Sequence, residues 1–216
     1  MDNQYEAING QSTSELTILK NKHIENIYKI EINNASQPLL TNLKKTGLLT
    51  GSSINTFFTE ISFQANSVST LQEYIQKNNW TYKNTLELVY SLTKQLEFLN
   101  KNGYSFYGYD IGSILVINKS LFFQISTEYL VPTIHDTITF YLPFSKKIFI
   151  SPEMHKITCL PQTISFKTIY YSLSTLCIYL LFKKKIIEKH TLDPIQDTKL
   201  YWFLIRALEK RKLLYL

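Results

Sequence analysis

Hydrophobic and polar positions divide the chain into a strand-rich first part and a mainly helical remainder. Two short stretches, ELTIL and NIYKIEIN, are rich in β-branched and aromatic residues and predict a pair of strands. Residues 36–47 predict a short helix that ends at Gly47, and residues 54–63 alternate as a strand does. Residues 1–14 are polar and predict a flexible tail.

From Ser67 onward the apolar spacing becomes helical. A short helix is expected over 67–78, and a long helix is expected over 85–101 with its end at Asn102–Gly103. A small pair of strands follows, in ILVIN and LFFQIS, and a looser segment with several prolines runs to about Thr163. Residues 165–182 predict a buried helix, and a last helix is expected from Lys199. This order predicts an α+β fold with segregated layers.

Composition narrows the chemistry more than it identifies it. The 216 residues suit one domain, and the net charge of +6 comes from scattered lysines, since Arg206 and Arg211 are the only arginines. That scatter argues against nucleic acid as the partner, although a lysine-rich binder of nucleic acid or of an anionic surface stays an alternative. Cys159 and Cys177 have neither metal-ligand nor disulfide spacing.

Neither a leader peptide nor a membrane span is expected. The first residues are polar and acidic, and the longest apolar run, residues 169–182, is too short to cross a bilayer comfortably. The sequence therefore predicts an intracellular, cytoplasmic protein.

Several stretches resemble the protein-kinase fold in order and spacing. TFFTEISF and LQEYIQKN resemble the strand before the kinase hinge and the helix after it, and FISPEM resembles the A-P-E stretch. YSFYGYDIGSILVIN lies where a kinase has H-R-D-L-x-x-x-N and the strand that follows. YYSLSTLCIYLLF and KLYWFLIRALEKR are similar to two late kinase helices. The resemblance implies a tail over 1–14, a reduced β-rich lobe over 15–65 and a helical lobe over 66–216.

The register of the central loop decides what the resemblance implies for catalysis. The kinase Asn directly precedes the apolar strand, so its position falls on Ser113 and the position of the catalytic Asp falls on Gly108. A frame that makes Asp110 the base would put Leu115 at the metal-binding Asn position, where an apolar side chain cannot hold Mg²⁺.

The other positions for phosphoryl transfer are also degenerate. Ser126 stands where D-F-G should begin, and Glu128 is the nearest acid that could replace this metal ligand. Lys29 is the one candidate for the phosphate-binding lysine, but no acid lies between Glu31 and Glu60 to pair with it in the usual way. No glycine-rich phosphate loop is present.

Two further groups of residues carry expectations from the resemblance. Glu153 and Arg211 occupy the positions of a buried kinase ion pair, for which the guanidinium fork is suited. Tyr107 and Tyr109 are expected either as exposed contacts for a partner or as packing inside the degenerate site.

The resemblance therefore implies a pseudokinase that binds another protein and uses no cofactor. One alternative is a divergent active kinase that uses ATP and Mg²⁺ with Asp110 or Glu128 in the place of lost groups. The plentiful Lys, Asn and Ile and the compact first part resemble degenerate kinase-like proteins of large DNA viruses. That likeness implies a host cytoplasm or a virion as the location.

Overall fold

The first part of the molecule is an antiparallel sheet in the order β1-β2-β3-β5-β4. A computed structural model describes residues 4–8, 16–184 and 190–209. The expected strand pair is confirmed as the hairpin of β2 and β3, and β5 pairs with β3. The bounds of the strands are β1 Tyr5–Ala7, β2 Leu16–Asn21, β3 Ile27–Ile32, β4 Ser53–Ile54 and β5 Glu60–Gln64.

Two expectations for this part are wrong. Residues 5–7 do not belong to a loose tail, because β1 pairs with β2 in antiparallel register. Residues 54–63 do not form one strand, because the chain turns between β4 and β5. The Asn55 side chain stabilises this turn by accepting hydrogen bonds from the backbone N–H groups of Thr59 and Glu60, at 3.0 and 3.1 Å.

Helix α1, Gln37–Lys45, connects the sheet with the rest of the molecule. Its first turn is favoured by Ser36, which accepts a hydrogen bond from Leu39 N, and by a proline. Its apolar face is buried, and Asn42 donates from Nδ2 to the carbonyl of Gln95 on the long helix at 3.0 Å. Gly47 follows in the left-handed region, as the sequence predicts for the end of this helix.

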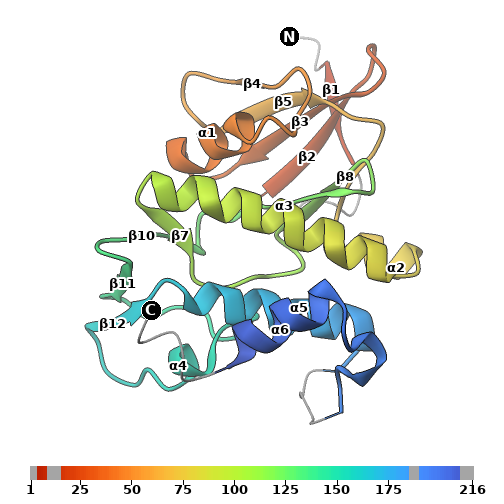
Figure 1. The fold of residues 1–216 in the computed structure, drawn as a ribbon. Coiled ribbons are helices and arrows are strands. Elements are labelled where there is room, and N and C mark those ends of the chain that lie inside the picture. Colours follow the sequence, from red (N-terminus) through yellow and green to blue (C-terminus); the bar gives the residue numbers. More distant parts are fainter. Residues whose placement is uncertain (1–3, 9–15, 185–189, 210–216) are drawn as a thin grey trace.

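The long helix α3, Tyr82–Lys101, runs between the sheet and the last two helices (Figure 1). Thr81 and Asn84 form a capping box at its start. Helix α2, Leu71–Lys77, precedes α3. Helix α5, Thr168–Phe182, packs on the other side of α3, and helix α6, Lys199–Leu208, packs on α5. A short 3-10 helix, η1 Asp193–Ile195, precedes α6.

Small antiparallel sheets hold the loops between these helices. A three-stranded sheet joins β6, β8 and β9, as expected for the pair β8 and β9, while β10 pairs with β7. The segment expected to be loose in fact contains β10, β11 and the short helix α4, Pro152–His155. The bounds are β6 Val68–Thr70, β7 Tyr104–Phe106, β8 Ile114–Ile117, β9 Leu121–Gln124, β10 Leu130–Pro132, β11 Thr137–Phe140 and β12 Gln162–Ser165.

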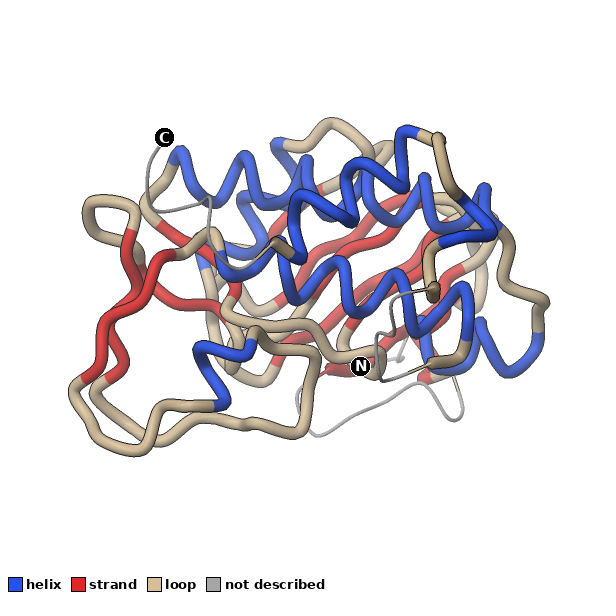
Figure 2. The backbone as a smooth tube through the Cα atoms, turned by 60° about the horizontal axis from the view of Figure 1, so that its bottom comes forward, coloured by secondary structure: helices blue, strands red, loops and turns tan. Residues whose placement is uncertain are grey.

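The chain thus mixes helices with antiparallel strands, in agreement with the coarse α+β expectation. Figure 2 shows the helices gathered over the strands, with the pair β11 and β12 standing away from them. Among the described residues, no helix has both the length and the apolar character needed to span a bilayer.

Candidate functional site

The central loop, Tyr107–Ser113, connects β7 with β8. Strand β8 begins at Ile114, as the register drawn from the sequence requires. Ser113 therefore directly precedes the strand, and Gly108 lies in the first half of the loop. The loop is anchored at both ends, because Tyr107 N donates to Tyr129 O at 3.1 Å and Ile125 N donates to Ser113 O at 2.8 Å.

Gly108 has no room for a side chain. A Cβ atom built on it would lie 2.7 Å from Ile148 Cδ1, 2.7 Å from Ile150 Cγ2 and 2.8 Å from the carbonyl oxygen of Phe149. Carbon atoms in a packed interior are separated by about 3.5–4.0 Å. The φ angle of Gly108 is not left-handed, so this glycine is required for space and not for backbone conformation.

The space beside Gly108 is filled by a segment from later in the chain, Ile148–Ile150, which we call the blocking segment. Phe149 forms an antiparallel bridge with Tyr109, in which each backbone N–H donates to the other carbonyl, at 2.9 and 3.0 Å. The preceding Lys146 donates from Nζ to the carbonyls of His155 and Ile157, at 3.1 and 2.7 Å. The bridge fixes the blocking segment against the central loop, and the two Lys146 bonds hold the chain just before this segment to the residues at the end of α4.

The polar groups at the end of the loop form hydrogen bonds with each other. Ser113 donates from Oγ to Asp110 Oδ2 at 3.2 Å, and its backbone N–H donates to Asp110 O at 3.0 Å. Ser126 is fully buried just after β9, and the bond from Ile125 to Ser113 brings it near the loop. The structure therefore brings Ser113 close to Ser126, with Asp110 as the nearby carboxylate, whereas Gly108 lies against Ile148–Ile150.

The two charged candidates lie on other elements. Lys29 is on β3, where its Nζ lies 2.6 Å from Glu31 Oε1 and 3.6 Å from Glu60 Oε2, and 4.9 Å from the centre of the Tyr5 ring. Burial alone would lower the pKa of Lys29, but the two carboxylates outweigh it and raise this pKa. Its ammonium group is thus used within its own sheet. Glu128 is exposed in the turn after β9.

Tyr107 and Tyr109 are not exposed contacts, and that expectation is wrong. Both side chains are buried, 2% and 0% exposed, because the blocking segment covers the loop at Tyr109 and strand β11 covers it at Tyr107. The ring of Tyr107 packs edge-on against Tyr129 and Phe140, with centroids 5.6 Å away in each case. Their role as packing, which was the other expectation, fits these contacts.

Tyr109 points into the interior beside α5. Burial, then the neighbouring Tyr170 and Cys177, raise the pKa of its hydroxyl well above the ordinary value. That hydroxyl has no hydrogen-bond partner within the described part of the chain. Tyr109 is therefore a neutral packing residue at any physiological pH.

Of the expected ion pair between Glu153 and Arg211, the structure describes only Glu153. Arg211 lies outside the described residues. Glu153 lies in the first turn of α4 and is exposed, so its carboxylate is not the buried partner that the resemblance implies. Its charge still acts locally, since burial and then Glu153 raise the pKa of Tyr171.

A cleft of about 780 Å³ opens beside the central loop and the blocking segment. It lies between the loop, α2, α4 and α5, and Phe149 lines it with its ring 5.4 Å from that of Tyr179. The polar residues that line it and bear on its chemistry are Asp110, Lys147, His155, Lys156, Tyr171 and Thr175.

The cleft has a basic character. Lys147, His155 and Lys156 line it and are exposed, whereas Asp110 is the one carboxylate that lines it among the described residues. Charge of one sign along a concave surface attracts ligands of the opposite sign. The cleft is suited to an acidic ligand.

Sequence reasoning missed the blocking segment and the cleft. The apolar triplet at 148–150 is visible in the sequence, but its pairing with Tyr109 is a contact across forty residues that no periodicity encodes. The cleft residues come from separate elements without a shared motif, so their assembly depends on the tertiary fold.

Comparison with known proteins does not add a relative. No protein-family model matches this chain, and no curated protein matches it.

Proposed function

We propose that this chain is a catalytically inactive kinase-like protein whose work is to bind another protein. The observation that carries the proposal is the closed space beside Gly108. In the register that resembles H-R-D-L-x-x-x-N, this is the position of the carboxylate that accepts the hydroxyl proton. Phosphoryl transfer there lacks its base, and the blocking segment occupies the room that a base would need.

The order of elements supports the kinase-like part of the proposal. Strands β1 to β5 form the first sheet, with α1 between β3 and β4 in the chain, and the long helix α3 then leads to β7, the central loop and the pair β8 and β9. Strand β10 returns to pair with β7, and α5 is buried beneath the loop. The resemblance drawn from the sequence implies the same succession from the hinge strand onward.

The cleft supports the protein-binding part of the proposal. It is open to solvent, it carries exposed lysines, and it borders an aromatic floor formed by Phe149 and Tyr179. Aromatic side chains are enriched in protein interfaces, and charged side chains at the rim attract a partner of the opposite charge. The partner expected from this surface is a protein segment that carries acidic side chains.

Two measurements test the proposal. Purified protein incubated with Mg²⁺ and ATP labelled at the γ-phosphate is expected to label neither itself nor a generic protein substrate. Gly108→Asp is expected to restore no labelling, because the added carboxylate meets the blocking segment. Transfer by the wild type that disappears in Asp110→Ala would establish the alternative of a divergent active kinase.

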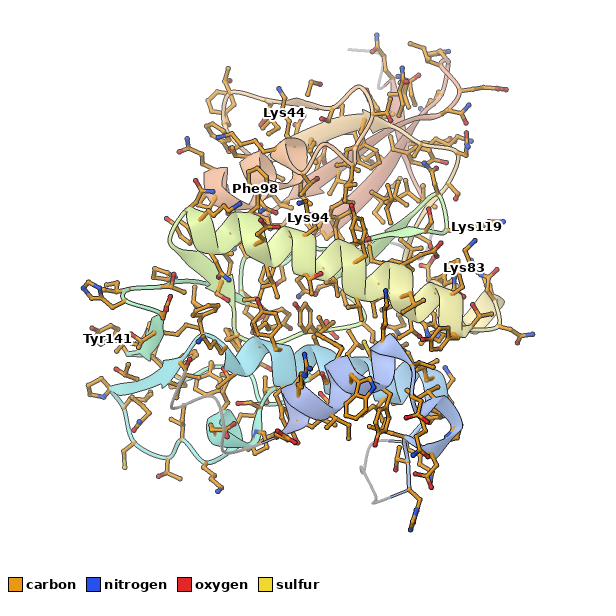
Figure 3. The ribbon with its side chains drawn as sticks, viewed as in Figure 1. Lys44, Lys83, Lys94, Phe98, Lys119 and Tyr141 are labelled. Atoms are coloured by element: carbon orange, nitrogen blue, oxygen red, sulfur yellow. The ribbon has the colours of Figure 1, made fainter. Side chains whose placement is uncertain are left out.

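The binding half is tested with charge-reversed variants of the cleft. Lys147→Glu with Lys156→Glu is expected to abolish capture of the cellular partner. The control is Lys44→Glu with Lys83→Glu, which makes the same change in net charge on α1 and α3, helices that contribute no residue to the lining given above for the cleft; Figure 3 labels both lysines. Loss of capture in both double variants would indicate attraction by overall charge. DNA or RNA binding that falls steeply with salt would favour the lysine-rich binder.

A further inference from the structure

Helix α6 carries a large aromatic ring between two cations on its solvent side. Its exposed residues are Lys199, Trp202 and Arg206, and its buried residues are Leu200 and Leu204. The side chain of Trp202 is 51% exposed. The outward side of an outer helix is usually polar, so an exposed tryptophan at its centre indicates contact with a partner.

A hollow of about 520 Å³ lies along this side of α6 and reaches α5. Its lining is apolar or aromatic except for two cations, and no acid lines it among the described residues; the lining residues, which we call the α6 surface, are Tyr170, Lys199, Trp202, Phe203, Arg206 and Ala207. Such a surface suits a partner that presents apolar groups together with anions.

The sequence concentrates positive charge at the same place. Lysines are scattered over the whole chain, but residues 199–216 contain five cations against one acid, Glu209. These 18 residues therefore carry a net charge of +4 out of the +6 of the chain. They also contain both arginines, Arg206 and Arg211, whose guanidinium groups are suited to phosphate.

A carboxylate on α3 lies near the hollow but does not cancel its charge. Burial and then Glu97 raise the pKa of the Tyr170 hydroxyl, so this carboxylate is close enough to act on the lining. Glu97 is itself paired with Lys94 and Lys101, whose Nζ atoms lie 3.3 and 2.8 Å from its oxygens. The three residues together add one positive charge beside the hollow.

We propose that the α6 surface binds an anionic lipid bilayer, with α6 lying in the plane of the head groups. Lys199 and Arg206 are seven residues apart, about 10 Å along the helix, so one small anion cannot contact both. A bilayer presents many anionic head groups above an apolar layer. Tryptophan is enriched at this boundary, because its ring is apolar and its N–H is polar. Helices that combine Lys or Arg with Trp or Phe bind there without spanning the membrane.

The chemistry of the hollow favours lipid over an acidic protein segment. Apart from its two cations, the lining offers only the Tyr170 hydroxyl and the Trp202 indole for hydrogen bonds from side chains. A specific protein interface commonly uses about ten hydrogen bonds. The α6 surface shares no residue with the cleft beside the central loop. The proposal therefore does not depend on the inactive loop, and its failure would leave protein binding at the cleft untouched.

Co-sedimentation with lipid vesicles tests the proposal. The wild type is expected to bind vesicles of phosphatidylcholine with about 30% phosphatidylserine, because each cation near an anionic surface strengthens binding about fivefold. Vesicles of phosphatidylcholine alone are expected to leave the protein in solution. Added NaCl is expected to weaken the binding, since salt screens exposed charges.

Charge-reversed variants locate the contact. Lys199→Glu with Arg206→Glu is expected to lower the partition coefficient at least about tenfold. The control is Lys44→Glu with Lys119→Glu, which makes the same change in net charge on α1 and in the turn between β8 and β9 and is expected to lower it less than about threefold. Figure 3 labels both control residues. Circular dichroism establishes that both double variants are folded.

Tryptophan fluorescence gives a second measurement at constant charge. Trp80 is held inside by the bond from its Nε1 to Thr85 Oγ1 at 2.8 Å and by its edge-on contact with Phe122, whereas Trp202 is exposed. Anionic vesicles are therefore expected to shift the emission to shorter wavelength through Trp202, and Trp202→Phe is expected to abolish this shift.

Three results would overturn the proposal: a wild type that does not bind the anionic vesicles, equal weakening by both double variants, or an emission shift that persists in Trp202→Phe. Binding of an acidic amphipathic peptide through Lys199 and Arg206, without binding to vesicles, would assign the α6 surface to a protein partner instead.

Discussion

Because the space beside Gly108 is filled, Gly108→Ala is expected to destabilise the fold. The added methyl group meets Ile148 and Ile150 at 2.7 Å and the Phe149 carbonyl at 2.8 Å, so the blocking segment must move by about 1 Å to reach ordinary contact. That movement also strains the two backbone hydrogen bonds between Tyr109 and Phe149. Overpacking of this kind costs about 1–3 kcal/mol, and the strained bonds place this case near the upper end.

Urea unfolding followed by circular dichroism measures this cost. A loss of about 2–3 kcal/mol corresponds to a melting temperature lower by roughly 4–12 °C for a chain of this length. Gly112→Ala is the matched control in the same loop, because its added Cβ meets the Asp110 and Gln72 side chains, which can move, at 3.2 and 3.5 Å. Its expected effect is within about 1 kcal/mol.

The contact partner can be identified by a double-variant cycle. Ile148→Val removes the Cδ1 atom that is closest to the new methyl group, so Gly108→Ala with Ile148→Val is expected to be more stable than the two separate effects predict. Equal stability of Gly108→Ala and Gly112→Ala, or strict additivity with Ile148→Val, would refute the closed space beside Gly108.

Three other predictions follow from the buried groups. Gln95→Leu is expected to cost about 2–5 kcal/mol in urea unfolding, because the backbone N–H and C=O of Gln124 each lose a buried hydrogen bond, at 3.0 and 2.9 Å; a cost under 1 kcal/mol would contradict this. Tyr107→Ala is expected to cost about 3–5 kcal/mol through the cavity that it leaves among three aromatic rings, and a stable variant would show that the ring is not packed there. Burial raises the pKa of the Cys177 thiol far above its usual range, so a thiol reagent at pH 8 is expected to modify only the exposed Cys159 in the folded protein and both cysteines in urea; rapid modification of two thiols without urea would contradict the buried position.

Local pattern was sufficient for most of the elements. The hairpin β2–β3, the helix ending at Gly47, the long helix α3 and the pair β8 and β9 all follow from periodicity and capping residues that act within a few positions. The start of β8 at Ile114 could also be predicted from the sequence, and the alignment of the central loop with the kinase pattern depends on that start alone.

The errors arise where tertiary contacts decide. Strand β1 is polar and exposed, and it forms because it pairs with the free edge of β2. The turn between β4 and β5 depends on hydrogen bonds to the side chain of one asparagine. Tyr107 and Tyr109 looked like contacts for a partner because their loop is rich in aromatic residues. Their burial is caused by the blocking segment, which pairs with Tyr109, and by the rings of Tyr129, Phe140 and Phe144, which pack against Tyr107.

For the charged candidate residues as well, the sequence predicted local features but not tertiary contacts. The sequence suggested that Lys29 lacks the usual helix partner, and α1 indeed has no acid in its first turn. Its actual partners are Glu31, two residues further along β3, and Glu60 on the neighbouring strand β5. The register between β3 and β5 brings Glu60 next to Lys29, and the sequence does not reveal that register. Glu153 could be placed on a helix from the sequence, but its exposure could not.

The central proposal is that the chain neither binds Mg·ATP at this loop nor transfers phosphate from it, and a thermal melt with this ligand tests the binding most directly. A ligand at a hundred times its dissociation constant adds about 2.7 kcal/mol of stability. The account predicts that millimolar ATP with Mg²⁺ leaves the melting temperature of the wild type unchanged. A rise of several degrees that Asp110→Ala abolishes would contradict it.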